Sequence, residues 1–221
     1  VRNYYVTRDF SNKLPFKNGG SVNIDRFFYG FGVQYEFKEL LPEDFNFTVG
    51  MDIDRQRDKR KRFNNNSGIL GALSFDQDEH VSSDGIFAQG RYDKDRWSIS
   101  TGIRYDKVTF DIQDHYLANG NDSGKLNFDA MSPSIGINYE LDAGILFGNI
   151  SSSFETPTTT ELANPDSSGG FNAALKPQKA NNIEIGYKAN YEDFYYELAL
   201  FEIDLKDELT PYELEASPGR T

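Results

Sequence analysis

The stretch that decides the fold is Trp97-Ser98-Ile99-Ser100-Thr101-Gly102-Ile103-Arg104-Tyr105, in which apolar and polar residues alternate. Side chains point alternately to the two faces of a β-strand, so this stretch has an apolar face and a polar face. The same alternation recurs at residues 45–54 and 134–140. The apolar face of the first stretch carries Trp97, Ile99, Ile103 and Tyr105, and its polar face carries Ser98, Ser100, Gly102 and Arg104.

Two kinds of β-protein produce this alternation, and they differ in what touches the apolar face. In a water-soluble sandwich the apolar face packs into a core, whereas in a transmembrane barrel it meets hydrocarbon and the polar face lines the lumen. The polar positions here include charges such as Asp52, Asp54 and Glu140. The choice between the two folds depends on the rest of the chain.

The composition narrows the class of protein. The chain has 221 residues, of which 38% are hydrophobic and 14% aromatic, so a folded structure is expected. No run approaches the roughly 18 apolar residues that a membrane helix needs, which excludes a helical membrane protein but leaves a β-barrel open. The net charge of -12 argues against nucleic acid as a partner. Cysteine is absent, and any export signal is expected upstream of Val1.

Nine strands and no helix are predicted, joined by connections that alternate in length. The strands are expected near residues 1–8, 20–37, 44–55, 84–92, 96–110, 126–140, 145–155, 181–191 and 194–207. Long extracellular loops are expected near 56–83, 111–125 and 156–180, and short turns near 38–43, 93–95, 142–144 and 192–193. An up-and-down transmembrane barrel places its short turns at one end and its long loops at the other. The alternation therefore favours such a barrel over a Greek-key sandwich.

The alternation fails at two places. Phe110 and Ile112 are out of phase with Ile103 and Tyr105, and a similar change occurs within residues 22–27. Either β-bulges or strands that continue beyond the membrane would produce such a change. The sequence leaves both explanations open.

Two motifs resemble those of TonB-dependent outer-membrane receptors. Ser151-Ser152-Ser153-Phe154-Glu155-Thr156-Pro157-Thr158-Thr159-Thr160-Glu161-Leu162 is similar to the family pattern Ser-x-x-Phe-x-x-Pro-x-x-x-Glu-Leu. Leu175-Lys176-Pro177-Gln178-Lys179-Ala180-Asn181-Asn182-Ile183-Glu184-Ile185-Gly186 is similar to Leu-Lys-Pro-Glu-Lys-x-x-x-x-Glu-x-Gly, with Gln178 in place of Glu. Shorter matches occur at residues 100–106, 131–139 and 199–209. The resemblance covers residues 84–221, and residues 1–83 agree in pattern only.

The resemblance implies an all-β fold. It would be an antiparallel up-and-down meander that forms a partial segment of a transmembrane β-barrel, about nine strands of an expected 22. Residues 1–221 would then form one partial barrel domain from the middle to late part of a receptor, without its plug. A complete small barrel is the alternative, because eight strands suffice to close one.

The resemblance also implies a function, which is TonB-dependent uptake of a scarce ligand across the bacterial outer membrane, with a ferric siderophore as the expected class. Its partners would be outer-membrane lipid and lipopolysaccharide, the N-terminal plug of the parent chain, TonB acting through that plug, and a ferric chelate or similar small ligand. No nucleic acid, cofactor, metal site or enzymatic activity is expected. The alternative is a soluble extracellular β-sandwich that binds a glycan or a protein.

Two segments supply candidate ligand-binding residues. The basic run at residues 55–62 holds six cations, which would contact lipopolysaccharide phosphates or attract an anionic ferric chelate, or would form an ordinary solvated loop. The segment 156–180 is punctuated by proline and glycine, which is typical of an ordered surface loop. Its prolines also fit a purely structural role at the barrel rim. The candidates are Arg55, Arg57, Arg60, Arg62, Thr156, Pro157, Glu161, Asn164, Phe171 and Asn172.

Overall fold

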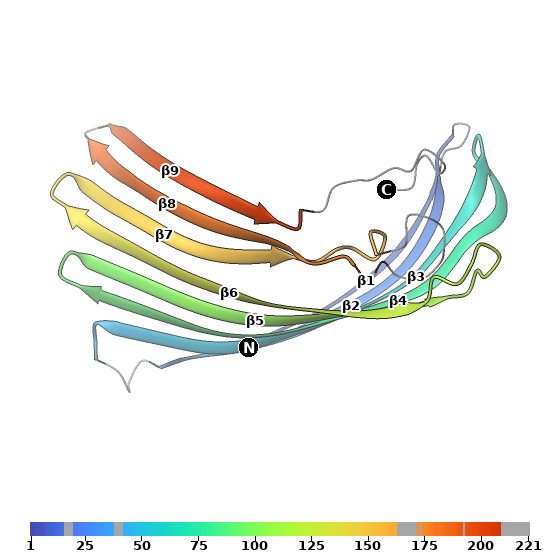
Figure 1. Cartoon of the computed structure of the whole chain (residues 1–221), viewed down its shortest axis with the longest axis horizontal. Coiled ribbons are helices and arrows are strands. Elements are labelled where there is room, and N and C mark those ends of the chain that lie inside the picture. The colour runs from blue at the N-terminus through green and yellow to red at the C-terminus, as the bar shows by residue number, and fades with distance from the viewer. Residues whose placement is uncertain (16–19, 38–41, 163–171, 173, 192, 209–221) are drawn as a thin grey trace.

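The computed structural model describes residues 1–15, 20–37, 42–162, 172, 174–191 and 193–208. Nine strands pair in chain order to form one antiparallel sheet (Figure 1). The strands are β1 (Arg2–Lys13), β2 (Ser21–Phe37), β3 (Phe45–Asn66), β4 (Ile69–Lys94), β5 (Trp97–Asp114), β6 (Gly124–Leu141), β7 (Gly144–Glu155), β8 (Gln178–Tyr191) and β9 (Phe194–Lys206). No helix in the described ranges is long and apolar enough to cross a membrane.

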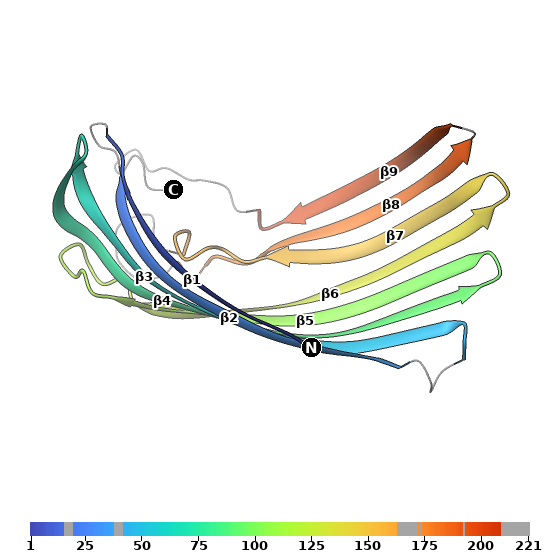
Figure 2. The same cartoon turned by 180° about the vertical axis from the view of Figure 1, so that it is seen from behind.

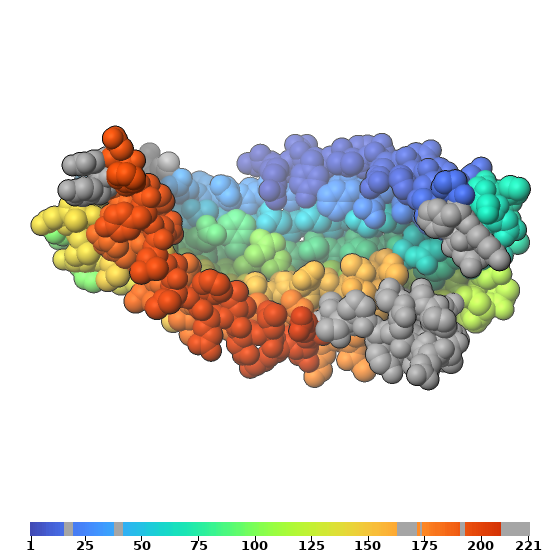
Figure 3. All heavy atoms as spheres, turned by 90° about the horizontal axis from the view of Figure 1, so that it is seen from above, coloured from blue at the N-terminus to red at the C-terminus, as the bar shows by residue number. Residues whose placement is uncertain are grey.

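The sheet curves into an open trough with a convex and a concave face. Figure 3 shows β1 and β9 on opposite sides of this trough. The strand order is a simple meander, which confirms the predicted up-and-down topology. A Greek-key sandwich would need a second sheet against the apolar face of Ile99 and Ile137, and the described strands form one sheet only. Ile137 accordingly keeps 42% of its surface exposed.

The short turns lie together at one end of the sheet, as predicted. The strand ends Phe37 and Phe45, Lys94 and Trp97, Leu141 and Gly144, and Tyr191 and Phe194 share that end in both views (Figures 1 and 2). The strand ends Lys13 and Ser21, Asn66 and Ile69, Asp114 and Gly124, and Glu155 and Gln178 share the other end. This arrangement fixes a common direction for the sheet, with one end of tight turns and one end that carries the longest loop.

The prediction of a long loop at residues 56–83 is wrong. β3 and β4 remain paired up to a turn that consists of Ser67 and Gly68, both with positive φ. The prediction ended these strands where the apolar alternation stopped, but charged residues continue the pairing and form cross-strand contacts such as Lys61–Asp76 at 3.0 Å. The other two predicted loops are shorter than expected, because β5 extends to Asp114 and β8 starts at Gln178.

An apolar band covers the convex face of the half of the sheet that carries the short turns. On β5 the band runs from Trp97 to Tyr105, which is about 26 Å of extended strand. Its side chains have no covering layer in the described structure, and Ile86 and Met131 remain 60% exposed. Across β4 to β7 the band includes Ile86, Tyr92, Trp97, Ile99, Ile103, Tyr105, Met131, Ile135, Ile137, Tyr139, Leu146 and Ile150.

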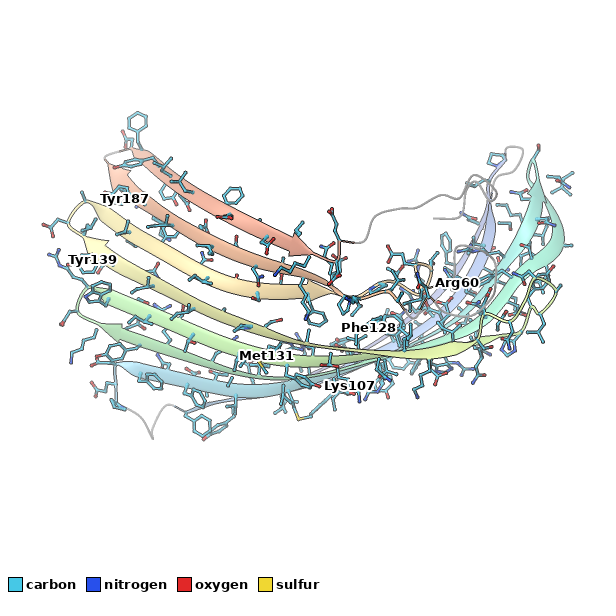
Figure 4. The ribbon with its side chains drawn as sticks, in the orientation of Figure 1. Arg60, Lys107, Phe128, Met131, Tyr139 and Tyr187 are labelled. Atoms are coloured by element: carbon cyan, nitrogen blue, oxygen red, sulfur yellow. The ribbon has the colours of Figure 1, made fainter. Side chains whose placement is uncertain are left out.

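Beyond Tyr105 the two faces of the sheet exchange character. On β5 Phe110 and Ile112 point to the concave face and are 4% and 2% exposed, while Lys107 lies on the convex face (Figure 4). The register from β4 through β6 is continuous, so no bulge causes the change. A β-bulge is thus excluded for this part of β5, which continues as a strand to Asp114. We call the level of Tyr105 and Asp106 the rim. Residues above the rim lie towards the end that carries the longest loop, and residues below it lie towards the short turns.

Candidate functional site on the concave face

The basic run divides between the two faces of β3. Because side chains alternate along a strand, Arg55 and Arg57 point to the convex face, whereas Arg60 and Arg62 point to the concave face. The sequence pattern predicted that these four arginines lie in one basic run on a loop. The structure places them on a strand above the rim, in two separate environments.

The convex arginines pair with acidic residues of β4. Arg55 Nη2 lies 2.7 Å from Asp84 Oδ1, and Arg57 Nη2 lies 3.2 Å from Asp78 Oδ2. The Arg57 side chain is 46% exposed, and such open ion pairs contribute about 0–1 kcal/mol each. This part of the convex face is therefore a charged, solvated surface directly above the apolar band.

Arg60 is buried in a polar node on the concave face. Its guanidinium forms an ion pair with Glu79, and its Nη1 donates a hydrogen bond to Thr160 Oγ1 at 2.8 Å. Thr159 Oγ1 donates to Glu79 Oε2 at 3.0 Å. The two charged side chains are 12% and 2% exposed. Burial raises the pKa of Glu79, which lies above the rim, and the positive charge of Arg60 opposes that shift.

The segment after β7 folds inward and covers this node. Glu161 organises its first turn, because Glu161 Oε2 accepts a hydrogen bond from the Thr158 N–H at 2.6 Å, as in a capping box. The next residue, Leu162, is fully buried against Phe110 and Phe128. We call Phe110, Phe128 and Leu162 the inner cluster. The Glu-Leu pair of the family-like motif thus holds a turn and anchors it to the sheet.

The remaining loop candidates also contact their own chain. Pro157 is buried at the start of the loop, immediately after the half-buried Thr156. Asn172 donates its backbone N–H to the Leu162 carbonyl at 2.8 Å, and its side-chain Oδ1 accepts from the Ala174 N–H at 3.1 Å. Asn164 and Phe171 lie outside the described residues. The described candidates of this loop therefore have structural contacts that keep the loop over the sheet.

Sequence reasoning missed two arginines on the concave face of β1 and β2. Arg26 forms a two-point ion pair with Asp58, with distances of 2.8 Å from Nε and 2.5 Å from Nη2. Arg8 lies directly opposite Arg26 in the β1–β2 register, and its guanidinium stands 4.9 Å from the centre of the Phe10 ring. Each is an isolated cation in the sequence, so only the register of the hairpin could have identified the pair.

Below the rim, a second network of charges crosses the concave face. Arg104 bonds Asp52 Oδ2 at 2.8 Å through Nη1 and contacts Asp106 Oδ1 at 2.7 Å through Nη2. Gly85 lies under the Arg104 guanidinium, and a Cβ at that position would stand 2.1 Å from Nη2 and 2.7 Å from Cζ. A side chain at position 85 would therefore force the end of the flexible Arg104 side chain to shift out of this network.

We expect Gly85→Val to destabilise the fold by about 1–3 kcal/mol, since the new side chain would push Arg104 away from both carboxylates. The unfolding temperature of the purified full-length protein, followed by its heat-dependent gel migration, measures the effect. Gly148→Ala is the matched control, because a Cβ there meets its nearest atom at an ordinary 3.5 Å. Equal unfolding temperatures for the two variants would contradict the assigned role of Gly85.

Comparisons with known proteins agree with this architecture. The family model "TonB dependent receptor-like, beta-barrel" matches residues 1–220. The rhizobactin receptor of Rhizobium meliloti (strain 1021) is 24% identical over 234 residues, which cover 85% of this chain and 31% of that receptor. The chain thus spans about a third of the relative that it matches.

Solved structures share the fold of this chain at low sequence identity. The ferric citrate transporter FecA in its unliganded form superposes with a TM-score of 0.72 at 19% identity, over 92% of this chain and 31% of that chain. The ferric yersiniabactin uptake receptor FyuA from Yersinia pestis gives 0.69 at 15% identity, over 93% and 33% of the two chains. With its nine-stranded meander and the match over residues 1–220, the chain belongs to the TonB-dependent receptor-like β-barrel family.

Proposed function

We propose that this chain forms part of the barrel of a bacterial outer-membrane receptor that imports a ferric siderophore in a TonB-dependent manner. The observation that carries the proposal is the uncovered apolar band on the convex face, combined with a charged concave face at the same height. Hydrocarbon is the medium that such a band requires. The names of the relatives, which include a rhizobactin receptor and a ferric citrate transporter, support iron-chelate uptake as the cargo class.

The two faces suggest different partners within that function. The apolar band would contact outer-membrane lipid, and the charged convex surface above it would lie among lipopolysaccharide headgroups, where Arg55 and Arg57 could exchange their carboxylate partners for phosphates. The concave face below the rim, including Arg104, would face the N-terminal plug through which TonB acts. Above the rim, the concave face would meet the ligand.

Uptake of radioactive iron tests the proposal. The full-length receptor is produced in iron-starved cells that lack other siderophore receptors, with and without TonB, and each strain is supplied with a set of ferric siderophores. We expect at least one of these chelates to enter the cells, and only when both the receptor and TonB are present. Iron uptake that is unchanged in the strain without TonB, or no uptake at all, would contradict the proposed function.

A further inference from the structure

We infer that two hollows on the convex face of β3 to β6 form one binding site for a single phosphorylated glycolipid. One straight acyl chain lies in an apolar hollow of the band below the rim, and the headgroup lies in a polar hollow above the rim. The inference rests on the proposed position of the apolar band in the outer membrane. It goes beyond general contact with lipid, because it assigns a site that selects one molecule of stated chemistry.

The acyl hollow is a depression in an otherwise bulky part of the apolar band. Gly90 and Thr101 lie opposite each other on β4 and β5, and the larger Phe47 and Ile135 continue the same row on β3 and β6. The next row towards the rim carries the small Ala88 on β4. The depression has a volume of about 550 Å³. A hydrocarbon chain that fills it gains dispersion contacts with the larger side chains on both sides.

The headgroup hollow lies on the same strands above the rim. Arg55, Ser82 and Thr109 form one row across β3, β4 and β5, and Arg57 and Lys125 line the hollow farther from the rim. Its volume is about 840 Å³, which falls within the roughly 300–1,000 Å³ of small-molecule sites. The hollow is therefore large enough for a sugar headgroup together with its phosphate.

The cations of the headgroup hollow are available to a phosphate. The exposed ion pairs of Arg55 and Arg57 contribute about 0–1 kcal/mol each, so a phosphate can replace their carboxylate partners at low cost. A guanidinium also binds phosphate through two parallel hydrogen bonds. Lys59 and Lys107 are exposed on the same face and form no ion pair among the residues that the structure describes (Figure 4).

An aromatic group on β1 and β2 favours a sugar headgroup over a simple phosphate. The rings of Tyr5 and Phe27 make an edge-to-face contact with centroids 5.0 Å apart, and Phe27 lies 5.7 Å from Tyr29. Tyr29 lines the headgroup hollow and is 43% exposed. Such rings present an apolar face to the C–H groups of a sugar, while the hydroxyl groups of Ser82 and Thr109 can bond its hydroxyls.

The spacing of the two hollows fits one lipid of the outer leaflet. Thr101 lies four residues below Tyr105 on β5, which is about 13 Å of extended strand. The hydrocarbon of one leaflet is about 15 Å deep, half of the full core. An acyl chain whose headgroup lies just above the rim therefore reaches Thr101 and Gly90. The two hollows are thus occupied by the two ends of the same molecule.

Binding of defined lipids to the purified full-length receptor tests the inference. The receptor is stripped of bound lipid in detergent and titrated with a diphosphorylated hexa-acyl glucosamine disaccharide, with the same glycolipid lacking its phosphates, and with phosphatidylglycerol. Native mass spectrometry counts the bound molecules and gives each Kd. We expect one tightly bound molecule of the phosphorylated glycolipid, with a Kd about tenfold or more below those of the other two lipids.

Substitutions in each hollow assign the two ends of the lipid. We expect Arg55→Gln combined with Arg57→Gln to weaken binding of the phosphorylated glycolipid about tenfold or more. Arg96→Gln is the matched control, because it breaks an exposed ion pair of the same kind at the short-turn end. Thr101→Leu fills the acyl hollow with a side chain that hydrocarbon accepts, and we expect about threefold weaker binding. Its control is Ile99→Leu, which alters the band outside the hollow.

The outcomes separate the inference from the proposed function. Equal Kd values for the three lipids, or unchanged binding in either the double arginine variant or Thr101→Leu, would overturn the inference and leave the uptake function intact. An equal loss in Arg96→Gln or Ile99→Leu would also overturn it, because the effect would then be unspecific. Tight phosphate-dependent binding by a receptor that supports no TonB-dependent uptake would refute the proposed function and retain the lipid site.

Discussion

Replacing Ile135 by arginine is expected to prevent assembly of the full-length receptor in the membrane, whereas the same replacement of its neighbour Ser134 is expected to be tolerated. Ile135 points outward from the middle of the apolar band and is 51% exposed. An arginine on the hydrocarbon-facing side of a barrel costs about 2–4 kcal/mol near the midplane. Ser134 points to the concave face, where charged residues are already accommodated, so an arginine there stays in a polar environment.

The two variants separate the membrane interpretation from a soluble one. Both residues are exposed on the surface of the sheet, so a protein surrounded by water would accept arginine at either position with similar ease. Outer-membrane fractionation and heat-dependent gel migration report how much folded barrel each variant forms. Equal yields of folded protein for Ile135→Arg and Ser134→Arg would refute the assignment of the apolar band to lipid.

The second large effect is expected at the buried node under the loop. Replacing Arg60 by methionine removes the positive charge next to Glu79 and leaves that carboxylate 2% exposed without its ion-pair partner. Loss of one member of a buried pair costs about 3–5 kcal/mol. We expect the penalty to open the loop locally, because Thr159 and Thr160 attach the loop to these same two side chains.

Hydrogen exchange of the loop amides, particularly that of Leu162, measures the opening. The matched control is Arg57→Met on the convex face of the same strand, where an exposed pair with Asp78 predicts about 0–1 kcal/mol. Pairing Arg60→Met with Glu79→Leu removes the unpaired buried carboxylate, and we expect it to recover only part of the lost protection, because the hydrogen bonds of Thr159 and Thr160 to these side chains stay absent. Unchanged exchange in Arg60→Met would show that Arg60 does not hold the loop in place.

The sequence was a good guide to the fold where apolar and polar side chains alternate along the strands. The alternation at Trp97–Tyr105 and at residues 134–140 predicted strands, their faces and the common end of the short turns, all of which the structure contains. Above the rim the pattern changes because the convex face carries charged side chains, whereas the apolar side chains of Phe110 and Ile112 point to the concave face. The paired segments at 56–83 consequently looked like a loop, although the β3–β4 ladder continues through them.

The candidate site was less accessible from sequence, because its contacts join distant parts of the chain. Arg60 and Thr160 are 100 positions apart in the sequence. No local sequence pattern indicates that a loop covers Arg60. If the run had been recognised as a strand, the alternation of side chains would have placed Arg55 and Arg57 on one face and Arg60 on the other. Arg8 and Arg26 become neighbours only through the β1–β2 register, which the sequence does not specify.

The exchange of apolar faces at the rim has a consequence for how the chain matures. If the apolar band faces lipid as proposed, that half of the sheet buries its apolar side chains only in the membrane, while the other half, with Phe110, Phe128 and Leu162, can bury them in water. We therefore expect a newly made chain in an aqueous compartment to assemble the half that holds the inner cluster first. Insertion would then proceed from a pre-organised cap, and the transmembrane portion would be the last to acquire its native surroundings.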